Sequence, residues 1–363
     1  MGGVLHEIRK TPLLWLLVFV PLAIVGEQVW PEKHTLLFLF SILAVVPLAA
    51  LLSHATESVA ARTGDAIGGL LNATLGNLTE LVIALTALQA GQYLLVKASI
   101  AGAIVTNTLF MLGGSFLIGG LRFHEQTFNR LTARVQASLL FLATVALLMP
   151  SLIAKADGGA SMAQPLSLGL AILLMCAYGL SMLFSLKTHK AEFATAQHRE
   201  VEASETPWPV NIALIVLAVV TVLVALVSEV FVSSVQQAAN VLGLSPAFVG
   251  FVVVALVGSA AEVATAFSAA AKDRLDLSVG IALGSAAQIA LFVAPVLVIL
   301  SYFIGPAPMS LDFWPGAIVM MLIATMAATL LTNGGRSAWF VGVMILMVYA
   351  IFAMTLFLLP PQQ

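Results

Sequence analysis

The sequence has few charged residues and a single cysteine. Of its 363 residues, 9% are charged and 61% are hydrophobic, and the mean hydropathy is +1.07. Soluble domains carry about 25% charged residues, so this composition excludes an ordinary soluble protein and indicates a membrane protein. Cys176 is the only cysteine, which excludes an intramolecular disulfide. The formal net charge of −2 gives no reason to expect nucleic acid as a partner.

The sequence also lacks a polar stretch long enough for a soluble domain, since the longest, residues 187–207, has only about 20 residues. A transmembrane helix needs about 20 predominantly apolar residues. We therefore predict an all-α polytopic membrane protein with eleven transmembrane helices in a lipid bilayer. The predicted spans are residues 11–29, 35–54, 67–90, 94–120, 131–149, 164–186, 208–230, 246–271, 277–302, 311–332 and 338–359.

Basic residues gather on one side of the predicted membrane. Of the 15 Lys and Arg residues, only Lys33, Lys97 and Lys155 fall on the side opposite to the N-terminus. Cytoplasmic loops are enriched in Lys and Arg. We therefore expect an integral protein of the cell (inner) membrane, with the N-terminus and the 187–207 loop in the cytoplasm and the C-terminus outside.

Two stretches of the chain repeat one pattern. Gly76–Glu80 reads Gly-Asn-Leu-Thr-Glu and Gly258–Glu262 reads Gly-Ser-Ala-Ala-Glu, and the next spans repeat Gly102–Asn107 as Gly280–Ser285. Each copy has five spans, an odd number, so the second copy must enter the membrane with the opposite topology. Inverted repeats are typical of secondary transporters, whose substrate binds near the midplane. The predicted parts are an extra N-terminal helix, a first five-helix repeat, a cytoplasmic linker and a second repeat, at residues 1–33, 34–186, 187–207 and 208–363.

Glu80 and Glu262 are the only charged residues of two apolar stretches, residues 70–88 and 251–271. An ionised carboxylate at the bilayer centre costs roughly 2.5–3.5 kcal/mol, and no predicted span places a Lys or Arg near its centre. Each glutamate is therefore either protonated or ionised against a bound cation. A site that alternates between these states exchanges protons for a cation, because both compete for the same oxygens.

Oxygen-bearing residues surround the two glutamates in the sequence. Asn77 and Ser259 lie one helical turn before them, and the preceding Gly76 and Gly258 let the backbone deviate and free carbonyl oxygens. Carboxylate, amide and carbonyl oxygens suit a hard cation such as Ca²⁺, whereas the spans hold no His or Cys cluster for zinc or copper. The remaining candidate ligands lie on the spans that follow each glutamate and are Asn107, Ser285 and Gln288.

Simpler structural explanations stay open for these residues. A protonated buried glutamate can hydrogen-bond a neighbouring helix, and glycines or amides can serve helix packing. Two glutamates at symmetric positions favour function over packing. Glu57 and Glu229 occupy corresponding places near the ends of the second and seventh spans. They are either solvated carboxylates or members of a proton path.

Three segments, "GGLLNATLGNLTELVIAL", "GSAAEVATAFSAA" and "GIALGSAAQIALFVAPVLV", resemble the calcium/proton exchangers of the cation/calcium exchanger superfamily. The resemblance runs from about residue 36 to the end of the chain. It implies an eleven-helix antiporter that exchanges Ca²⁺ for H⁺ and needs no cofactor. By position, it makes Glu80 and Glu262 the carboxylates that bind the cation and the protons. The other residues that it places in this site are Asn77, Ser259, Asn107, Ser285 and Gln288.

The chain departs from that family at Ser259, where Asn is usual, and at Val263, where His is usual. These departures leave a Na⁺ or K⁺/proton antiporter of the same fold as an alternative, and a homo-oligomer also stays open. A channel would conduct without proton coupling. A membrane-embedded enzyme is a further alternative, but the sequence has neither a HExxH helix nor a GxSxG elbow. We therefore expect a transporter and not an enzyme.

Overall fold

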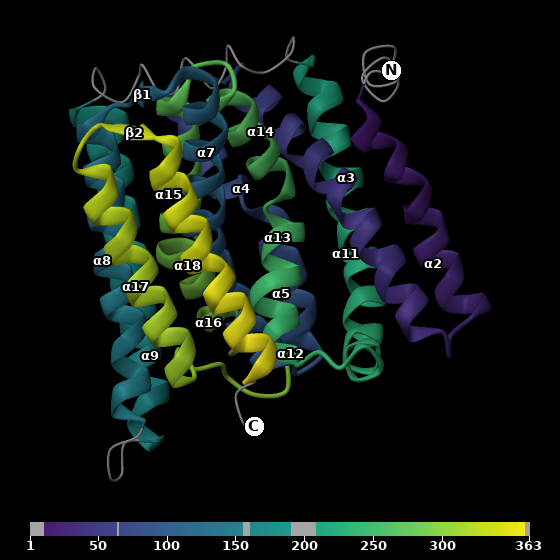
Figure 1. The fold of residues 1–363 in the computed structure, drawn as a ribbon. Coiled ribbons are helices and arrows are strands. Elements are labelled where there is room, and N and C mark those ends of the chain that lie inside the picture. The colour runs from purple at the N-terminus through teal and green to yellow at the C-terminus, as the bar shows by residue number, and fades with distance from the viewer. Residues whose placement is uncertain (1–10, 64, 155–159, 190–207, 360–363) are drawn as a thin grey trace.

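The computed structural model describes residues 11–63, 65–154, 160–189 and 208–359. This part of the chain is almost entirely helical (Figure 1). The elements before the linker are η1 (Pro12–Val18), α2 (Phe19–Val29), α3 (His34–Ala60), α4 (Asp65–Leu75), α5 (Leu78–Gln89), α6 (Tyr93–Val105), η2 (Thr106–Met111), α7 (Leu112–Phe123), β1 (Glu125–Thr127), α8 (Arg130–Ile153), α9 (Ala160–Leu183) and η3 (Phe184–Thr188). Those after it are α11 (Val210–Leu242), α12 (Pro246–Phe248), η4 (Val249–Val254), α13 (Ala255–Gly258), α14 (Ala260–Ala270), α15 (Leu275–Gln288), η5 (Ile289–Val293), α16 (Ala294–Leu300), α17 (Pro315–Thr332), β2 (Arg336–Ala338) and α18 (Trp339–Leu358).

The described residues contain nine helices that are long and apolar enough to cross a membrane. A tenth span consists of Pro246–Gly258 and Ala260–Ala270, which are bent against each other by 59°. The predicted third span is divided into α4 and α5 by a turn at Gly76 and Asn77, and α5 has only 12 residues. The helical, membrane-spanning class is therefore confirmed, whereas the count of eleven is not.

The seventh span is longer than the sequence predicted. We expected it to end at residue 230, but α11 continues to Leu242. No glycine or proline interrupts residues 231–242, so nothing in the backbone ends the helix there. It ends at Gly243, whose positive φ of 69° is a conformation that glycine adopts without strain. The additional turns carry several polar side chains that line the pocket described below.

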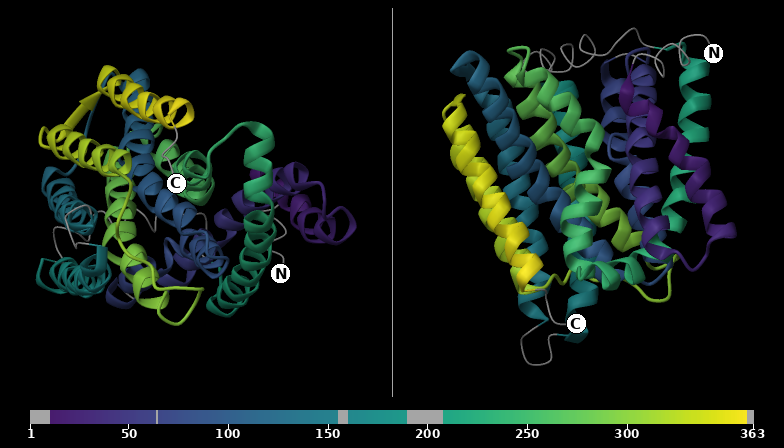
Figure 2. Two further views of the ribbon diagram at one scale, coloured as in Figure 1. Left: turned by 90° about the horizontal axis from the view of Figure 1, so that it is seen from below. Right: turned by 45° about the vertical axis from the view of Figure 1, so that its right-hand side comes forward.

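Helices from before and after the linker pack directly on each other. The long helices α3 and α11 lie side by side, and α2 covers them at one edge of the bundle (Figure 2). Near the centre, α6 crosses η4 so closely that a Cβ on Gly102 would lie 2.2 Å from the carbonyl oxygen of Phe251. Phe251 is itself fully buried. A glycine is required at this crossing because two backbones are in contact.

A short antiparallel ladder lies at the upper end of the bundle in Figure 1, and the all-helical prediction did not include it. Strands β1 and β2 pair Glu125 with Ala338 and Thr127 with Arg336. The buried side chain of Gln126 donates from Nε2 to the carbonyl oxygen of Ala270 at 3.0 Å. The ladder therefore connects the turns that follow α7, α14 and α17.

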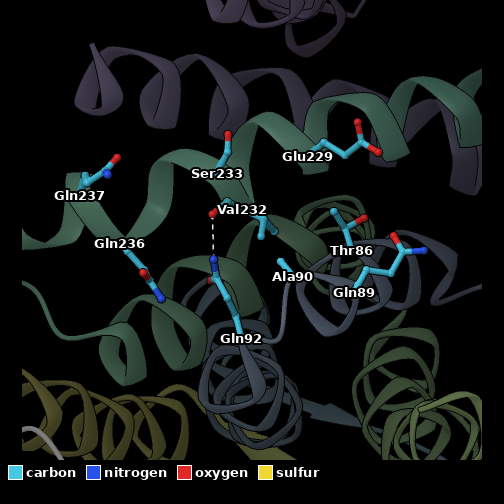
Figure 3. Close-up of a pocket in the computed structure, with 9 residues that line it drawn as sticks. All are labelled: Thr86, Gln89, Ala90, Gln92, Glu229, Val232, Ser233, Gln236 and Gln237. Carbon is cyan, nitrogen blue, oxygen red and sulfur yellow. Dashed lines mark hydrogen bonds between the residues drawn. The ribbon is translucent and has the colours of Figure 1, made fainter. Parts of the chain in front are cut away.

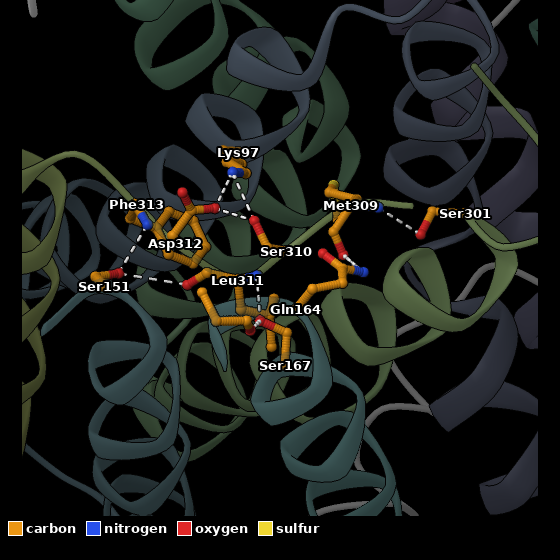
Figure 4. A network of polar contacts seen from close by, with 11 residues as sticks. Lys97, Ser151, Gln164, Ser167, Ser301, Met309, Ser310, Leu311, Asp312 and Phe313 are labelled. Atoms are coloured by element: carbon orange, nitrogen blue, oxygen red, sulfur yellow. Dashed lines mark hydrogen bonds and ion pairs between the residues drawn. The ribbon is translucent and has the colours of Figure 1, made fainter. Parts of the chain in front are cut away.

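The connection between α16 and α17 lies at the opposite end of the bundle, and polar contacts hold it in place (Figure 4). Lys97 of α6 forms an ion pair with Asp312. The Ser151 hydroxyl accepts from the Phe313 amide at 2.7 Å, and Ser167 accepts from Leu311 at 2.9 Å. Because these partners come from α6, α8 and α9, the connection fixes that end of three helices.

Candidate cation site

Both glutamates stand in the first turn of a helix that follows a break in the chain. Glu80 is the third residue of α5, after a turn at Gly76 and Asn77, and Glu262 is the third residue of α14, after a turn at Ser259. The first N–H groups of a helix have no intrahelical partner, and the helix dipole favours negative charge there. The backbone at these positions therefore favours negative charge without a Lys or Arg in the span.

The break before Glu262 lies directly against Glu80. A Cβ on Gly258 would be 3.0 Å from Cγ and 3.3 Å from Oε1 of Glu80. This contact joins α13 to α5, so segments from before and after the linker meet at the carboxylate. The Oε1 atom of Glu80 is buried and has no hydrogen-bond partner among the described residues. A buried acceptor without a donor is costly, and a cation is a partner that would satisfy it.

Four of the predicted ligands form one chain of hydrogen bonds. Asn107 donates from Nδ2 to the Ser285 hydroxyl at 2.9 Å, and Ser285 donates to Oδ1 of Asn77 at 2.8 Å. Asn77 then donates from Nδ2 to Oε1 of Gln288 at 2.6 Å. We refer to these four side chains as the amide chain. Each of its three hydrogen bonds joins the part before the linker to the part after it.

The amide chain leaves one buried oxygen without a donor. Asn107 is completely buried, and its Oδ1 atom has no hydrogen-bond partner in the described part of the molecule. The oxygens of Asn77, Ser285 and Gln288 each accept one hydrogen bond from another member of the amide chain. The predicted ligands of the amide chain therefore fall into two groups. Asn107 has an oxygen that is available to bind a cation, whereas the oxygens of Asn77, Ser285 and Gln288 already accept hydrogen bonds that hold these side chains in position.

The amide chain also reaches the first helix break. A Cβ on Gly76 would lie 3.5 Å from Oε1 of Gln288 and 2.6 Å from the carbonyl oxygen of Asn72. Gly76 thus lets α15 approach the turn that precedes Glu80. The π-helical segment η2 begins one residue before Asn107, and η5 begins directly after Gln288. Such segments are frequent at functional sites because they change which side chains face a neighbour.

The two positions that depart from the exchanger pattern occupy different environments. Ser259 is fully buried, and its hydroxyl donates to the Ala255 carbonyl oxygen at 2.9 Å. This hydrogen bond ties the Ser259 hydroxyl to the helix that precedes the break. Val263 is half-buried and packs against the hydrophobic core.

The other two predicted carboxylates lie in different surroundings. Glu57 is half-buried on α3 and accepts a hydrogen bond from Ser53 at 3.0 Å. Glu229 is exposed on α11, where it lines a pocket of about 340 Å³ against the end of α5 (Figure 3). Sequence reasoning missed the amide side chains of this pocket. The signal was present in Gln89, Gln236 and Gln237, which are amides in or beside apolar spans.

Known proteins resemble this chain over most of its length. The profile of the family "Sodium/calcium exchanger protein" matches residues 33–187 and 212–358. The chain belongs to this family. The chain is 40% identical over 367 residues to a Ca²⁺/H⁺ antiporter of Aphanothece halophytica. This match covers 97% of this chain and 98% of the relative.

Further relatives of this exchanger family cover nearly as much of the chain. The Ca²⁺/H⁺ antiporter ChaA of Bacillus subtilis (strain 168) is 40% identical over 343 residues, which is 94% of this chain and 97% of the relative. The solved structure of native YfkE, a Ca²⁺/H⁺ antiporter protein, superimposes with a TM-score of 0.83 at 36% identity. That match covers 96% of this chain and 100% of YfkE.

Proposed function

We propose that the protein is a secondary active antiporter that exports cytoplasmic Ca²⁺ in exchange for H⁺. The two relatives and YfkE, which match nearly the whole chain, are Ca²⁺/H⁺ antiporters. These names describe transporters and not enzymes. They support Ca²⁺ over Na⁺ or K⁺ as the transported cation.

One observation carries the proposal. The Oε1 atom of Glu80 is buried without a hydrogen-bond partner among the described residues, at a point where two helix breaks meet. A buried ionised carboxylate is costly unless its charge is compensated, and either a proton or a metal ion can compensate it. A carboxylate that accepts one or the other in turn couples the two fluxes.

The remaining residues have distinct roles in this mechanism. Glu80 and Glu262 alternately bind Ca²⁺ and protons, and Oδ1 of Asn107 supplies a neutral oxygen. The amide chain holds Asn107 in place, while Gly76 and Gly258 allow the close approach of the broken helices. Ser259 contributes lone pairs at the second break. Glu57 and Glu229 are candidates for carrying a further proton.

The proposal includes a topology. The two groups of five spans are inverted repeats that rock against each other around the site, with the extra N-terminal helix outside them. The N-terminus and the linker lie in the cytoplasm, and the C-terminus lies outside the cell membrane. The packing of α3 on α11 and of α6 on η4 supports a boundary between the repeats that runs through the site.

Transport into proteoliposomes tests the function directly. A pH gradient is imposed on vesicles that contain the purified protein, and the fluxes of Ca²⁺, Na⁺ and K⁺ are followed separately. We expect Ca²⁺ to move against the proton flux and collapse the gradient. A Ca²⁺ flux that ignores the pH gradient would indicate a channel, and proton exchange with Na⁺ or K⁺ alone would contradict calcium as the substrate.

A further inference from the structure

The pocket at the end of α5 is a separate polar space. It has a volume of about 340 Å³ and lies between α11 and the segment that runs from the last turns of α5 to the start of α6. Thr86 and Gln89 line it from α5, and Glu229, Ser233, Gln236 and Gln237 line it from α11 (Figure 3). Glu229 is its one carboxylate, and no basic side chain lines it among the described residues.

The polar side chains of this pocket all carry oxygen atoms. Thr86 donates its hydroxyl proton to the Val82 carbonyl oxygen at 3.0 Å. Ser233 donates to the Val230 carbonyl oxygen at 3.0 Å, with Oε1 of Glu27 as a second acceptor at 3.4 Å. Both hydroxyl oxygens therefore keep lone pairs for another partner. The amide of Gln89 adds a carbonyl oxygen on the side of the pocket where Glu229 lies, and the amide of Gln236 adds one on the other side of Gln92. Oxygen ligands of this kind suit a hydrated hard cation.

The pocket is held in shape by a contact between α11 and the turn after α5. Gln92 donates from Nε2 to the Val232 carbonyl oxygen at 3.0 Å, as Figure 3 shows. In that view Glu229 lies on the side where Thr86 and Gln89 project from α5, and Gln236 lies beyond Gln92. The pocket therefore does not depend on a bound ion to keep its two walls together.

We infer that this pocket is a second cation site, which holds a hydrated divalent cation through Glu229 on its way to or from Glu80. Helix α5 connects the two places, since Glu80 and Thr86 are six residues apart, or about 9 Å along a helix. The inference rests on the proposed antiport. The distribution of Lys and Arg puts this end of α5 outside, where exported Ca²⁺ leaves.

The charge of the pocket fits a site of release. Calcium sites with few charged ligands bind weakly, with dissociation constants of about 10⁻⁴–10⁻³ M in extracellular modules. A single carboxylate surrounded by neutral amides belongs to this weak class. Weak binding concentrates the cation at the exit without trapping it there. In this role Glu229 binds the cation as it enters or leaves, so Glu57 remains the candidate for carrying a further proton.

The inference is tested by measuring calcium binding to a variant in which both glutamates of the central site are replaced. In the variant that combines Glu80→Gln with Glu262→Gln, titration calorimetry with CaCl₂ should still detect one weak site. Adding Glu229→Gln should abolish it. The matched control is Glu32→Gln, which removes an exposed carboxylate from the connection between α2 and α3 and lines no part of the pocket. It should leave the weak site unchanged.

Sided transport gives a second readout. Glu229→Gln should raise the KM for Ca²⁺ added at the outer face by about threefold or more, with the KM at the cytoplasmic face unchanged. Its reversal potential should equal that of the wild type, because access does not alter the number of protons exchanged. Thermal unfolding of each variant shows whether it is folded.

The possible results separate the inference from the proposed function. Absence of the weak site, its persistence after Glu229→Gln, or an equal effect of Glu32→Gln would each overturn the inference. A shift of KM on both faces would do the same. Wild-type protein without proton-coupled Ca²⁺ flux would contradict the antiport, whereas the calorimetric result does not depend on proton coupling.

Discussion

Three structural features meet at the Glu80 carboxylate. Its Oε1 atom is buried, it stands in the first turn of α5, and it faces Gly258 at the second helix break. Replacing Glu80 or Glu262 by Gln preserves shape and hydrogen bonding but removes titration and negative charge. We therefore expect either variant to fold and to lose exchange, as measured by pH-driven Ca²⁺ flux in proteoliposomes. Retention of more than about a tenth of the wild-type flux, equivalent to about 1.4 kcal/mol, would contradict a mechanism with two carboxylates.

Ser285 bridges the amide chain, because it accepts from Asn107 and donates to Asn77. Ser285→Ala leaves a buried donor and a buried acceptor unpaired, at a cost of about 1–3 kcal/mol. We expect a lower melting temperature and an increase of at least about fivefold in the KM for Ca²⁺.

The matched control for Ser285 is Ser41→Ala. Ser41 is equally buried, but its hydroxyl bonds only to the Leu37 carbonyl oxygen of its own helix at 2.7 Å. This variant should leave the KM for Ca²⁺ unchanged. Equal KM values for the two variants would show that the amide chain does not position the cation ligands.

At the scale of elements, the crossing of α6 and η4 determines how closely the helices on the two sides of the linker approach. Gly102→Ala places a methyl group 2.2 Å from the Phe251 carbonyl oxygen, so the two backbones must separate. We expect Gly102→Ala to lower the melting temperature and the transport rate together. Thermal unfolding in detergent and flux in proteoliposomes measure the two effects.

Gly280 provides the comparison for Gly102, because it stands at the corresponding place of the repeated pattern. A Cβ there meets no atom within 4 Å. Since alanine favours a helix over glycine by about 1 kcal/mol, Gly280→Ala should leave stability unchanged or raise it. Similar destabilisation by both substitutions would show that helix propensity, and not the crossing, explains the effect.

For the whole molecule, the number of protons exchanged per Ca²⁺ determines whether the membrane potential drives transport. If Glu80 and Glu262 each release one proton, the cycle is electroneutral, and a pH unit supplies about 1.4 kcal/mol per proton. A third proton would leave one net charge, worth about 2.3 kcal/mol per 100 mV. We expect at least two protons.

Reversal of flux under a clamped potential measures this number. With two protons, the reversal point of calcium-loaded proteoliposomes ignores voltage. With three, it moves with voltage, and Glu57→Gln should then restore an electroneutral cycle. A reversal point that does not respond to the pH gradient would contradict exchange altogether.

The sequence by itself determined the features that depend on neighbouring residues. Apolar runs specify where helices cross the bilayer, because each span must satisfy its own backbone groups. The repeated Gly-x-x-x-Glu pattern identified Glu80 and Glu262, since a lone charge in an apolar run is detectable without any partner. The family resemblance, confirmed by the match to residues 33–187 and 212–358, came from these same local segments.

Only the tertiary structure determined which distant groups meet. The sequence placed Asn107, Ser285 and Asn77 near one site as equivalent ligands, but their order in the amide chain depends on contacts between residues about two hundred positions apart. The approach of Gly258 to Glu80 and the pocket around Glu229 likewise follow from packing. Periodicity reports which face of a helix is apolar, whereas the neighbour on that face is selected by the complementary shapes of both helices.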